Sequence, residues 1–131
     1  MKRSATLMQL SRDHHQALKL ALTVRRLDSH PDDQQVRSLA DEVGRMMVTE
    51  LEPHFQQEEG GLLPALAALG DTGQLVARTL EDHRFLRQAA AELRRHPDRA
   101  LLLGFAERLQ AHVRFEEREL FVVAEERLNF D

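Results

Sequence analysis

Two copies of one short motif constrain this chain most: a histidine followed four residues later by two glutamates, and then by two apolar residues. The pattern H-x-x-x-E-E-x-x-L-[LF] begins at His54 and again at His112. A stretch before each copy carries an Asp-His pair, ending at His14 in the first half and at His83 in the second. The two halves therefore read as an internal repeat, each with an Asp-His helix and a His-x-x-x-Glu-Glu helix.

Apolar residues around the motifs recur every three or four positions, as on one face of a helix. Leu102, Phe105 and Leu109, for example, lead into His112. No segment alternates with a period of two, so no sheet is expected. Chain reversals are expected at three groups of helix-breaking residues, at 29–33, at 60–73 with a short helical turn inside it, and at 96–98. We predict one domain, residues 1–131, that is all-α: an antiparallel up-down-up-down four-helix bundle.

The spacing of each motif has a chemical reason. Residues at i and i+4 of a helix lie about 5–6 Å apart at Cβ, so a histidine and the first glutamate after it point into the same cavity. A carboxylate has two oxygens and can bridge two metals, whereas an imidazole gives one nitrogen to one metal. Approximate two-fold symmetry would bring four histidines and two glutamates together in the core. This nitrogen and oxygen set suits iron, and it can also suit manganese or zinc.

Composition excludes other classes of site. The chain has no cysteine, so disulfides and thiolate metal sites are excluded. A net charge of -4 makes nucleic acid an unexpected partner. No apolar run is long enough for a membrane span and no secretory pattern follows the basic N-terminal residues, so we expect no membrane association and a cytoplasmic location. Tyrosine and tryptophan are absent, which removes one route for radical chemistry.

Several polar residues near the motifs have competing interpretations. His15 competes with His14 as the first-helix ligand, and helical phase favours His14. The acids beside the candidate ligands are expected to be solvated or ion-paired, with support of a ligand as the alternative: Asp13, Glu59, Asp82 and Glu117. We expect His30 and His96 at the surface, and Met46 and Met47 in the core rather than on a metal.

The chain resembles the hemerythrin-like domains of the His-His-Glu type over nearly its whole length. The resemblance rests on four segments: 10–14, 54–59, 81–83 and 112–121. It implies a four-helix bundle with two iron ions joined by an oxo or hydroxo bridge, and bridging roles for Glu58 and Glu116. The metal ligands that it implies are His14, His54, Glu58, His83, His112 and Glu116.

One position departs from the respiratory hemerythrins, which carry a second histidine four residues after the third-helix histidine. Arg87 stands there. We expect its side chain to extend to solvent, the alternative being that it lies over the site and steers a small anion. The departure favours sensing of oxygen, nitric oxide or cellular iron over oxygen carriage, with an unknown protein partner to pass on a signal. The alternatives are a di-iron enzyme acting on peroxide or nitric oxide, and a metal-free structural bundle.

Overall fold

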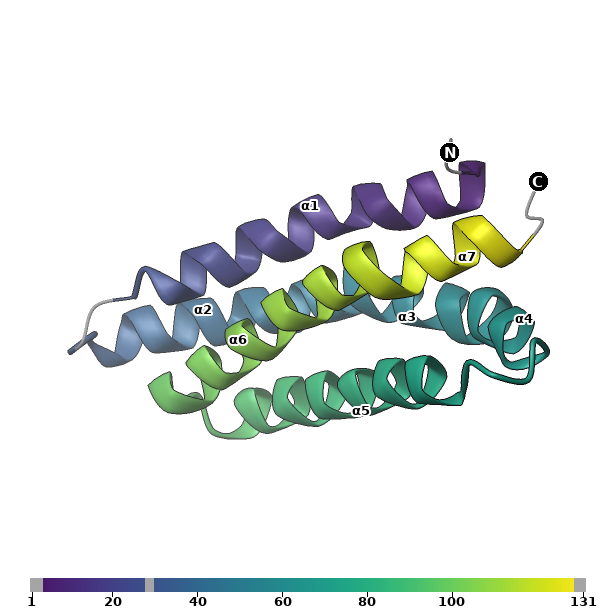
Figure 1. Cartoon of the computed structure of the whole chain (residues 1–131). Helices are drawn as coiled ribbons and strands as arrows, with labels where there is room; N and C mark the ends of the chain where they lie inside the picture. Colours follow the sequence, from purple (N-terminus) through teal and green to yellow (C-terminus); the bar gives the residue numbers. More distant parts are fainter. Residues whose placement is uncertain (1–3, 28–29, 129–131) are drawn as a thin grey trace.

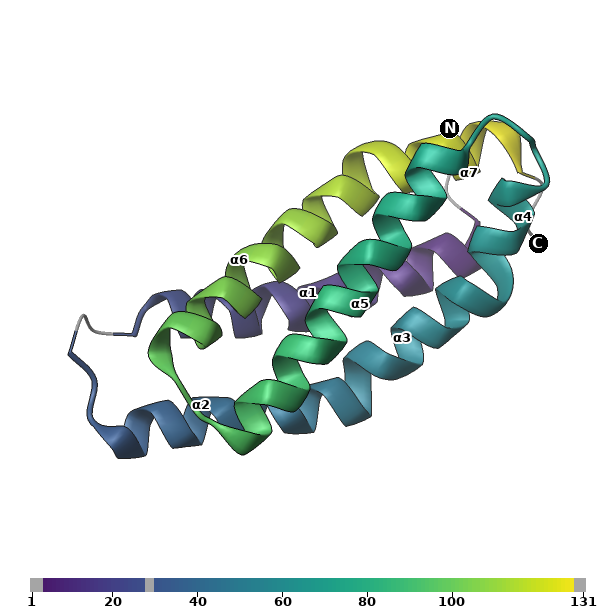
Figure 2. The same cartoon turned by 90° about the horizontal axis from the view of Figure 1, so that it is seen from below.

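The computed structural model describes residues 4–27 and 30–128, and in them the chain forms four helical rods without a strand. The rods lie side by side, and both described chain ends lie at the same end of the bundle (Figures 1 and 2). The expectation of an all-helical fold is confirmed for these residues. The first rod is α1 (Ala5–Arg25) and the third is α5 (Gly73–Arg95).

The second and fourth rods are each interrupted by π-helical turns, in which the backbone makes wider i→i+5 hydrogen bonds. In the second rod the segments are α2 (Asp33–Met46), η1 (Met47–Leu51), α3 (Glu52–Gln57), η2 (Glu58–Leu62) and α4 (Leu63–Ala67). In the fourth they are α6 (Arg99–Phe115), η3 (Glu116–Leu120) and α7 (Phe121–Arg127). α1 packs against α6, α6 against α5, and α5 against α2.

Polar side chains cap the starts of three rods. Ser4 accepts a hydrogen bond from the Leu7 amide, and Asp98 accepts one from the Leu101 amide. Asp32 forms a capping box with Gln35 at the start of α2. The helices therefore begin two residues after Pro31 and Pro97, not at the prolines, because the aspartates satisfy the free amides. Residues 1–3, 28–29 and 129–131 lie outside the described residues, and Ser29 of the first predicted break is among them.

The second predicted break begins too early. Gly60 and Gly61 do not end the helix but lie inside η2, and helix continues through Ala67. Pro64 is tolerated there because it lies in the first turn after a π-helical segment, where its missing amide removes little. The chain leaves the helix at Gly70, whose φ of +88° lies in the left-handed region that favours glycine.

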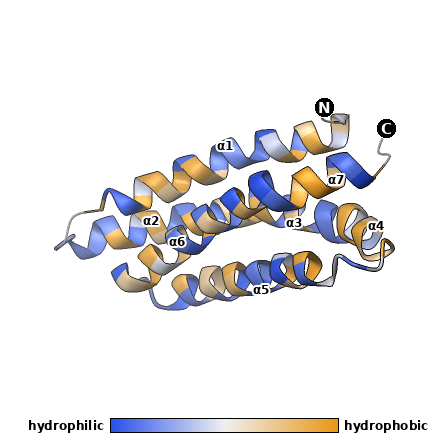
Figure 3. Cartoon of the chain, in the orientation of Figure 1, coloured by the Kyte–Doolittle hydropathy of each residue, from blue (hydrophilic) through white to orange (hydrophobic). Residues whose placement is uncertain are grey.

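Two apolar clusters divide the interior along the bundle axis. One contains Phe55, Phe105 and Leu109 with their neighbours, and the other contains Leu7, Leu10 and Phe121 with theirs. On every rod the predicted ligands fall in sequence between members of the two clusters, so a polar layer lies between two apolar ones. Hydrophobic and hydrophilic residues alternate along each helix (Figure 3), as expected of amphipathic helices. No helix among the described residues is long and apolar enough to cross a membrane.

Candidate metal centre

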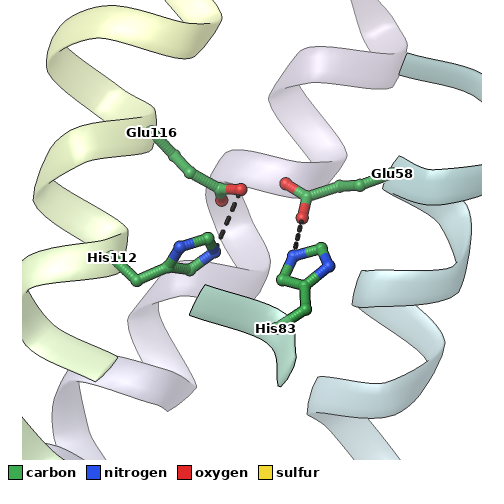
Figure 4. A group of neighbouring side chains, drawn as sticks. All are labelled: Glu58, His83, His112 and Glu116. Carbon is green, nitrogen blue, oxygen red and sulfur yellow. Dashed lines mark hydrogen bonds and ion pairs between the residues drawn. The ribbon is translucent and has the colours of Figure 1, made fainter. Parts of the chain in front are cut away.

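All six predicted ligands meet in the polar layer, and none is more than 5 % exposed. They come from all four rods: His14 from α1, His54 and Glu58 from the second, His83 from α5, and His112 and Glu116 from the fourth. Figure 4 shows four of them, with Glu58 and Glu116 pointing toward each other and each facing a histidine. The repeat thus produces one shared cluster, as its approximate symmetry predicts.

The inner nitrogen of each histidine faces a glutamate. His14 Nε2 lies 2.7 Å from Glu116 Oε1, and His83 Nε2 lies 2.9 Å from Glu58 Oε1. His112 Nε2 lies 3.1 Å from Glu116 Oε2. His54 Nε2 lies between the two carboxylates, 3.2 Å from Glu58 and 3.4 Å from Glu116. Four imidazole nitrogens and two carboxylates therefore converge on one volume.

Two sets of donor atoms are compact enough to hold an ion each, and Glu116 belongs to both. In each set the donor atoms lie within 4.8 Å of one another. One set consists of Glu58, His83, His112 and Glu116, and the other of His14, His54 and Glu116. The histidine rings of each set are 5.2 Å apart between centroids. The repeated sequence therefore yields two similar half-sites joined by a carboxylate.

Two of the π-helical segments of the described chain, η2 and η3, begin at these carboxylates, whereas η1 precedes them in the second rod. Glu58 is the first residue of η2 and Glu116 the first of η3. Pro64 follows η2, but Val122 stands at the matching place after η3, so a proline is not the common cause. π-Helical turns inside α-helices are frequent at functional sites. The position common to η2 and η3 is the glutamate of the repeat.

The outer nitrogen of each histidine is paired with a second carboxylate. The Nδ1 atoms lie 2.8 Å from Glu117 for His14, 3.0 Å from Asp13 for His54, 2.6 Å from Glu59 for His83 and 2.8 Å from Asp82 for His112. An Nδ1–H that donates to a carboxylate leaves Nε2 free to bind a metal and orients the ring. All four acids therefore agree with the alternative expectation, that they support a candidate ligand, and the favoured one, that they are only solvated or ion-paired, does not describe them.

Each outer acid pairs with a different histidine, because adjacent residues of a motif point in different directions. Residues i and i+1 of a helix point about 100° apart, so Glu117 reaches around to His14 while Glu116 points inward. Glu59 does the same for His83 beside Glu58. The second glutamate of each motif therefore contacts the histidine on the Asp-His helix of the other half.

Arg87 binds two acids instead of extending freely to solvent. Its guanidinium donates to both oxygens of Glu52 at 2.7 Å, and to Glu59 Oε2 at 2.9 Å. The side chain is 34 % exposed. Because Glu59 also contacts His83, Arg87 supports that histidine from the outside. Neither expectation for Arg87, solvent or a position over the site, describes this arrangement.

The remaining residues lie apart from the centre. His15 is exposed although it follows His14 directly, and His30 and His96 are exposed near the ends of helices. Met46 and Met47 are partly buried against the larger apolar cluster. Each of these positions agrees with what was expected of it, and only that of His15 follows from helical phase.

Burial and charge shift the pKa values of the cluster. Burial alone would lower the pKa of His54, but hydrogen bonds with Asp13, Glu116 and Glu58 raise it to about 12. Burial would likewise lower the pKa of His112, but the charge of Glu116 and a hydrogen bond with Asp82 raise it to about 10. Burial and the Glu116 charge raise the pKa of Glu58. Burial would raise the pKa of Glu116 as well, but His112 and other hydrogen-bond partners hold it well below the usual value.

Three atoms of the cluster lack a well-aligned hydrogen bond within the described part of the chain, although His112 Nε2 lies 3.1 Å from Glu116 Oε2 and His54 Nε2 lies 3.2 Å from Glu58 Oε2. They are Glu58 Oε2, Glu116 Oε2 and His112 Nε2, all buried. Buried polar atoms without a partner cost stability, and these three point into the volume that the other ligands surround. The donor set and its unsatisfied atoms both fit metal cations.

A comparison with protein-family models gives a match to the hemerythrin HHE cation-binding domain over residues 6–124. The chain belongs to this hemerythrin family. Searches of curated proteins and of solved structures gave no match. Family membership indicates that the hemerythrin domain described here binds a cation, and the His/Glu cluster is compatible with that.

Some residues around the hemerythrin centre were missed by sequence reasoning. Arg108 donates to Asp82 at 2.7 Å, and Arg78 lies 3.5 Å from the same carboxylate. Each stands one helical turn before a site residue, Arg108 before His112 and Arg78 before Asp82. That i−4 position is the signal that could have identified them.

Proposed function

We propose that the chain binds two iron ions in the polar layer, with His14, His54, Glu58, His83, His112 and Glu116 as ligands. Glu58 and Glu116 would bridge the ions, with an oxo or hydroxo bridge between them. The observation that carries the proposal is the pair of compact donor sets that share Glu116. Two unlinked sites would not need a common carboxylate. Iron is favoured by the mixed nitrogen and oxygen set and by the family, and manganese or zinc would suit the same atoms.

The proposal includes the antiparallel up-down-up-down order of the four rods. Short connections between successive rods support it, because a short connection places neighbouring helices antiparallel. This order puts the Asp-His helix and the His-x-x-x-Glu-Glu helix of each half side by side. The candidate ligands of both halves would then lie in one layer of the bundle rather than in two separate layers.

We propose that the site binds or senses a small ligand, oxygen or nitric oxide, or reports on cellular iron. Such an iron pair supplies reversible ligand binding coupled to a change of oxidation state. The chain's own contribution is to orient the four rings through the outer acids and to exclude bulk water between two apolar clusters. Arg87 is engaged by Glu52 and Glu59, so the position one turn after His83 adds no nitrogen, which would leave a coordination position for a ligand.

A di-iron enzyme acting on peroxide or nitric oxide is the second candidate. The same observation favours it, because fewer protein nitrogens leave more coordination positions for a reactant. Turnover of either compound by iron-loaded protein, above that of a His112→Ala variant, would support an enzyme. Full iron loading without turnover would support binding or sensing. A cytoplasmic location stays a prediction.

The deciding experiment measures metal content and the visible spectrum of protein expressed with added iron. We expect about two irons per chain, the number of donor sets, and absorption bands that bleach on reduction. The matched control is a His30→Ala variant, because His30 is exposed and away from the cluster. Protein without bound metal, with an unchanged melting temperature after chelation, would instead support the metal-free bundle.

A further inference from the structure

The two outer aspartates of the repeat have different surroundings. Asp82 contacts His112 and also two arginines: Arg108 Nε lies 2.7 Å from its Oδ1, and Arg78 Nε lies 3.5 Å from its Oδ2. Its side chain is 1 % exposed. Both positive charges therefore act on a carboxylate that water scarcely screens.

Asp13 is the matching aspartate and contacts His54, but its other hydrogen-bond partner is the neutral amide of Gln9 at 3.0 Å. Arg12 donates to Gln9 rather than to the carboxylate. The Asp13 side chain is 24 % exposed, so water weakens its negative charge without cancelling it. The Asp13–His54 pair therefore keeps a negative charge that the Asp82–His112 pair largely loses.

The different surroundings of the two aspartates follow from different residues at equivalent positions of the repeat. One turn before the aspartate stands Arg78 in the second half and Gln9 in the first. One turn before the motif histidine stands Arg108 in the second half and Glu50 in the first. At both positions the second half is more positive by at least one charge.

The arginines are held in place by aromatic rings. The guanidinium carbon of Arg108 lies 4.6 Å from the centroid of the Phe85 ring, and that of Arg78 lies 4.5 Å from the centroid of Phe115. Stacking on a ring restrains a guanidinium and adds to its ion pair. The positive charges beside Asp82 are thus a fixed part of the site.

We infer that Arg108 and Arg78 make the two ion positions unequal, lowering cation affinity beside His83 and His112 relative to the position beside His14 and His54, where neutral Gln9 takes the place of the arginines on the outer aspartate. This inference rests on the proposed function. The arginines do not touch the ion; they are positioning residues that act through Asp82. Changing the outer partner of a ligating histidine typically changes metal affinity by about 10–100-fold. A positive charge near a bound cation lowers its affinity, because like charges repel.

The test isolates each ion position. A His54→Ala variant keeps the complete donor set beside His83 and His112, and a His112→Ala variant keeps the set beside His14 and His54. Cobalt(II) affinity is measured by calorimetry in each background. We expect Arg108→Gln to raise affinity about tenfold in the first background and by less than about twofold in the second. Arg108→Lys, which keeps the charge, should restore the affinity of the parent.

The mirror substitution and a charge control complete the design. Gln9→Arg places an arginine one turn before Asp13, as Arg78 stands before Asp82, and should lower affinity about tenfold only in the His112→Ala background. Arg84→Gln removes the same charge from an exposed position on α5 and should leave the cobalt affinity of both backgrounds unchanged. If a background variant does not fold, the two binding steps of the otherwise native chain are compared, and Arg108→Gln should shift one of them.

Three results would overturn the inference. Arg108→Gln could raise affinity equally in both backgrounds, which would be a general effect of net charge. Arg108→Gln could leave the cobalt affinity of both backgrounds unchanged. Alternatively, Arg108→Lys could behave like Arg108→Gln, which would show that the effect comes from packing and not from charge. Absence of cobalt binding to the native chain would instead contradict the proposed function itself. This outcome is distinguishable from failure of the inference, because it is measured on the native chain without any substitution.

Discussion

Nε2 of His14 lies 2.7 Å from Oε1 of Glu116, although 102 positions separate them in the sequence. This contact joins the first rod to the last and links the two halves of the repeat. Glu116 also lies 3.1 Å from His112 on its other oxygen. One carboxylate therefore faces histidines of both donor sets.

Glu116→Gln should reduce metal content at both positions, because Glu116 belongs to both donor sets. Glu58→Gln is the matched variant: both glutamates are proposed to bridge, but only Glu116 belongs to both compact donor sets, so we expect Glu58→Gln to keep more metal per chain than Glu116→Gln. Metal analysis after dialysis and circular dichroism for the fold measure this difference. Equal metal content in the two variants would contradict the shared role of Glu116.

His14→Ala and His15→Ala compare adjacent residues of α1. His14 is buried against Glu116 and Glu117, whereas His15 is exposed. We expect His14→Ala to lose at least about tenfold in metal affinity, as expected when a ligand is removed, and His15→Ala to match the native chain. A loss of metal in His15→Ala with retention in His14→Ala would show that the first-helix ligand is His15.

The pH dependence of stability should change sign with metal. In metal-free protein the raised pKa values of His54, about 12, and His112, about 10, favour the folded state. Their contribution is complete below the unfolded pKa of about 6.5 and is lost as pH rises through the folded values. The free energy of unfolding should therefore fall between pH 7 and pH 9, because both histidines keep their proton in the folded state and lose it on unfolding.

Metal-loaded protein should show the opposite trend, because binding requires unprotonated imidazoles and releases protons. The stabilisation by zinc, which avoids oxidation during the measurement, should grow over the same pH range. Denaturant unfolding with and without zinc measures both slopes. Parallel slopes for the two forms would mean that the histidines do not exchange protons for metal.

The repeat was sufficient to predict the rods and the layer in which the six side chains meet. Helical phase alone places His14 inward and His15 outward, because adjacent residues differ by about 100°. The outer acids could not be assigned in the same way. Whether Glu117 turns toward solvent or toward His14 depends on the distance to another rod, and a periodic pattern contains no such distance.

Arg87 and the second rod show two further limits. An arginine at a half-buried position can extend to solvent or pair with acids, and only the positions of Glu52 and Glu59 decide between them. Gly60 and Gly61 are helix breakers by propensity, yet packing of Leu62 and Leu66 in the smaller apolar cluster maintains the helix. Tertiary burial outweighs local preference at that point.

Gly60 gives a prediction about stability that is independent of metal. It lies inside a helical turn, and a Cβ at this position would meet nothing within 4 Å. Gly60→Ala should therefore raise the free energy of unfolding by about 0.5–1 kcal/mol, because alanine loses less backbone freedom on folding. Unfolding by denaturant, with chelator present, measures it.

Gly70→Ala is the matched control, since Gly70 also has free space around it but has a φ of +88°. There the added Cβ strains the backbone, and we expect a loss of about 1 kcal/mol or more. The two glycines thus separate the effect of unfolded-state freedom from that of backbone conformation. A destabilising Gly60→Ala would show that η2 requires glycine for a reason other than the space around its backbone, and a stabilising Gly70→Ala would contradict the strain expected at a φ of +88°.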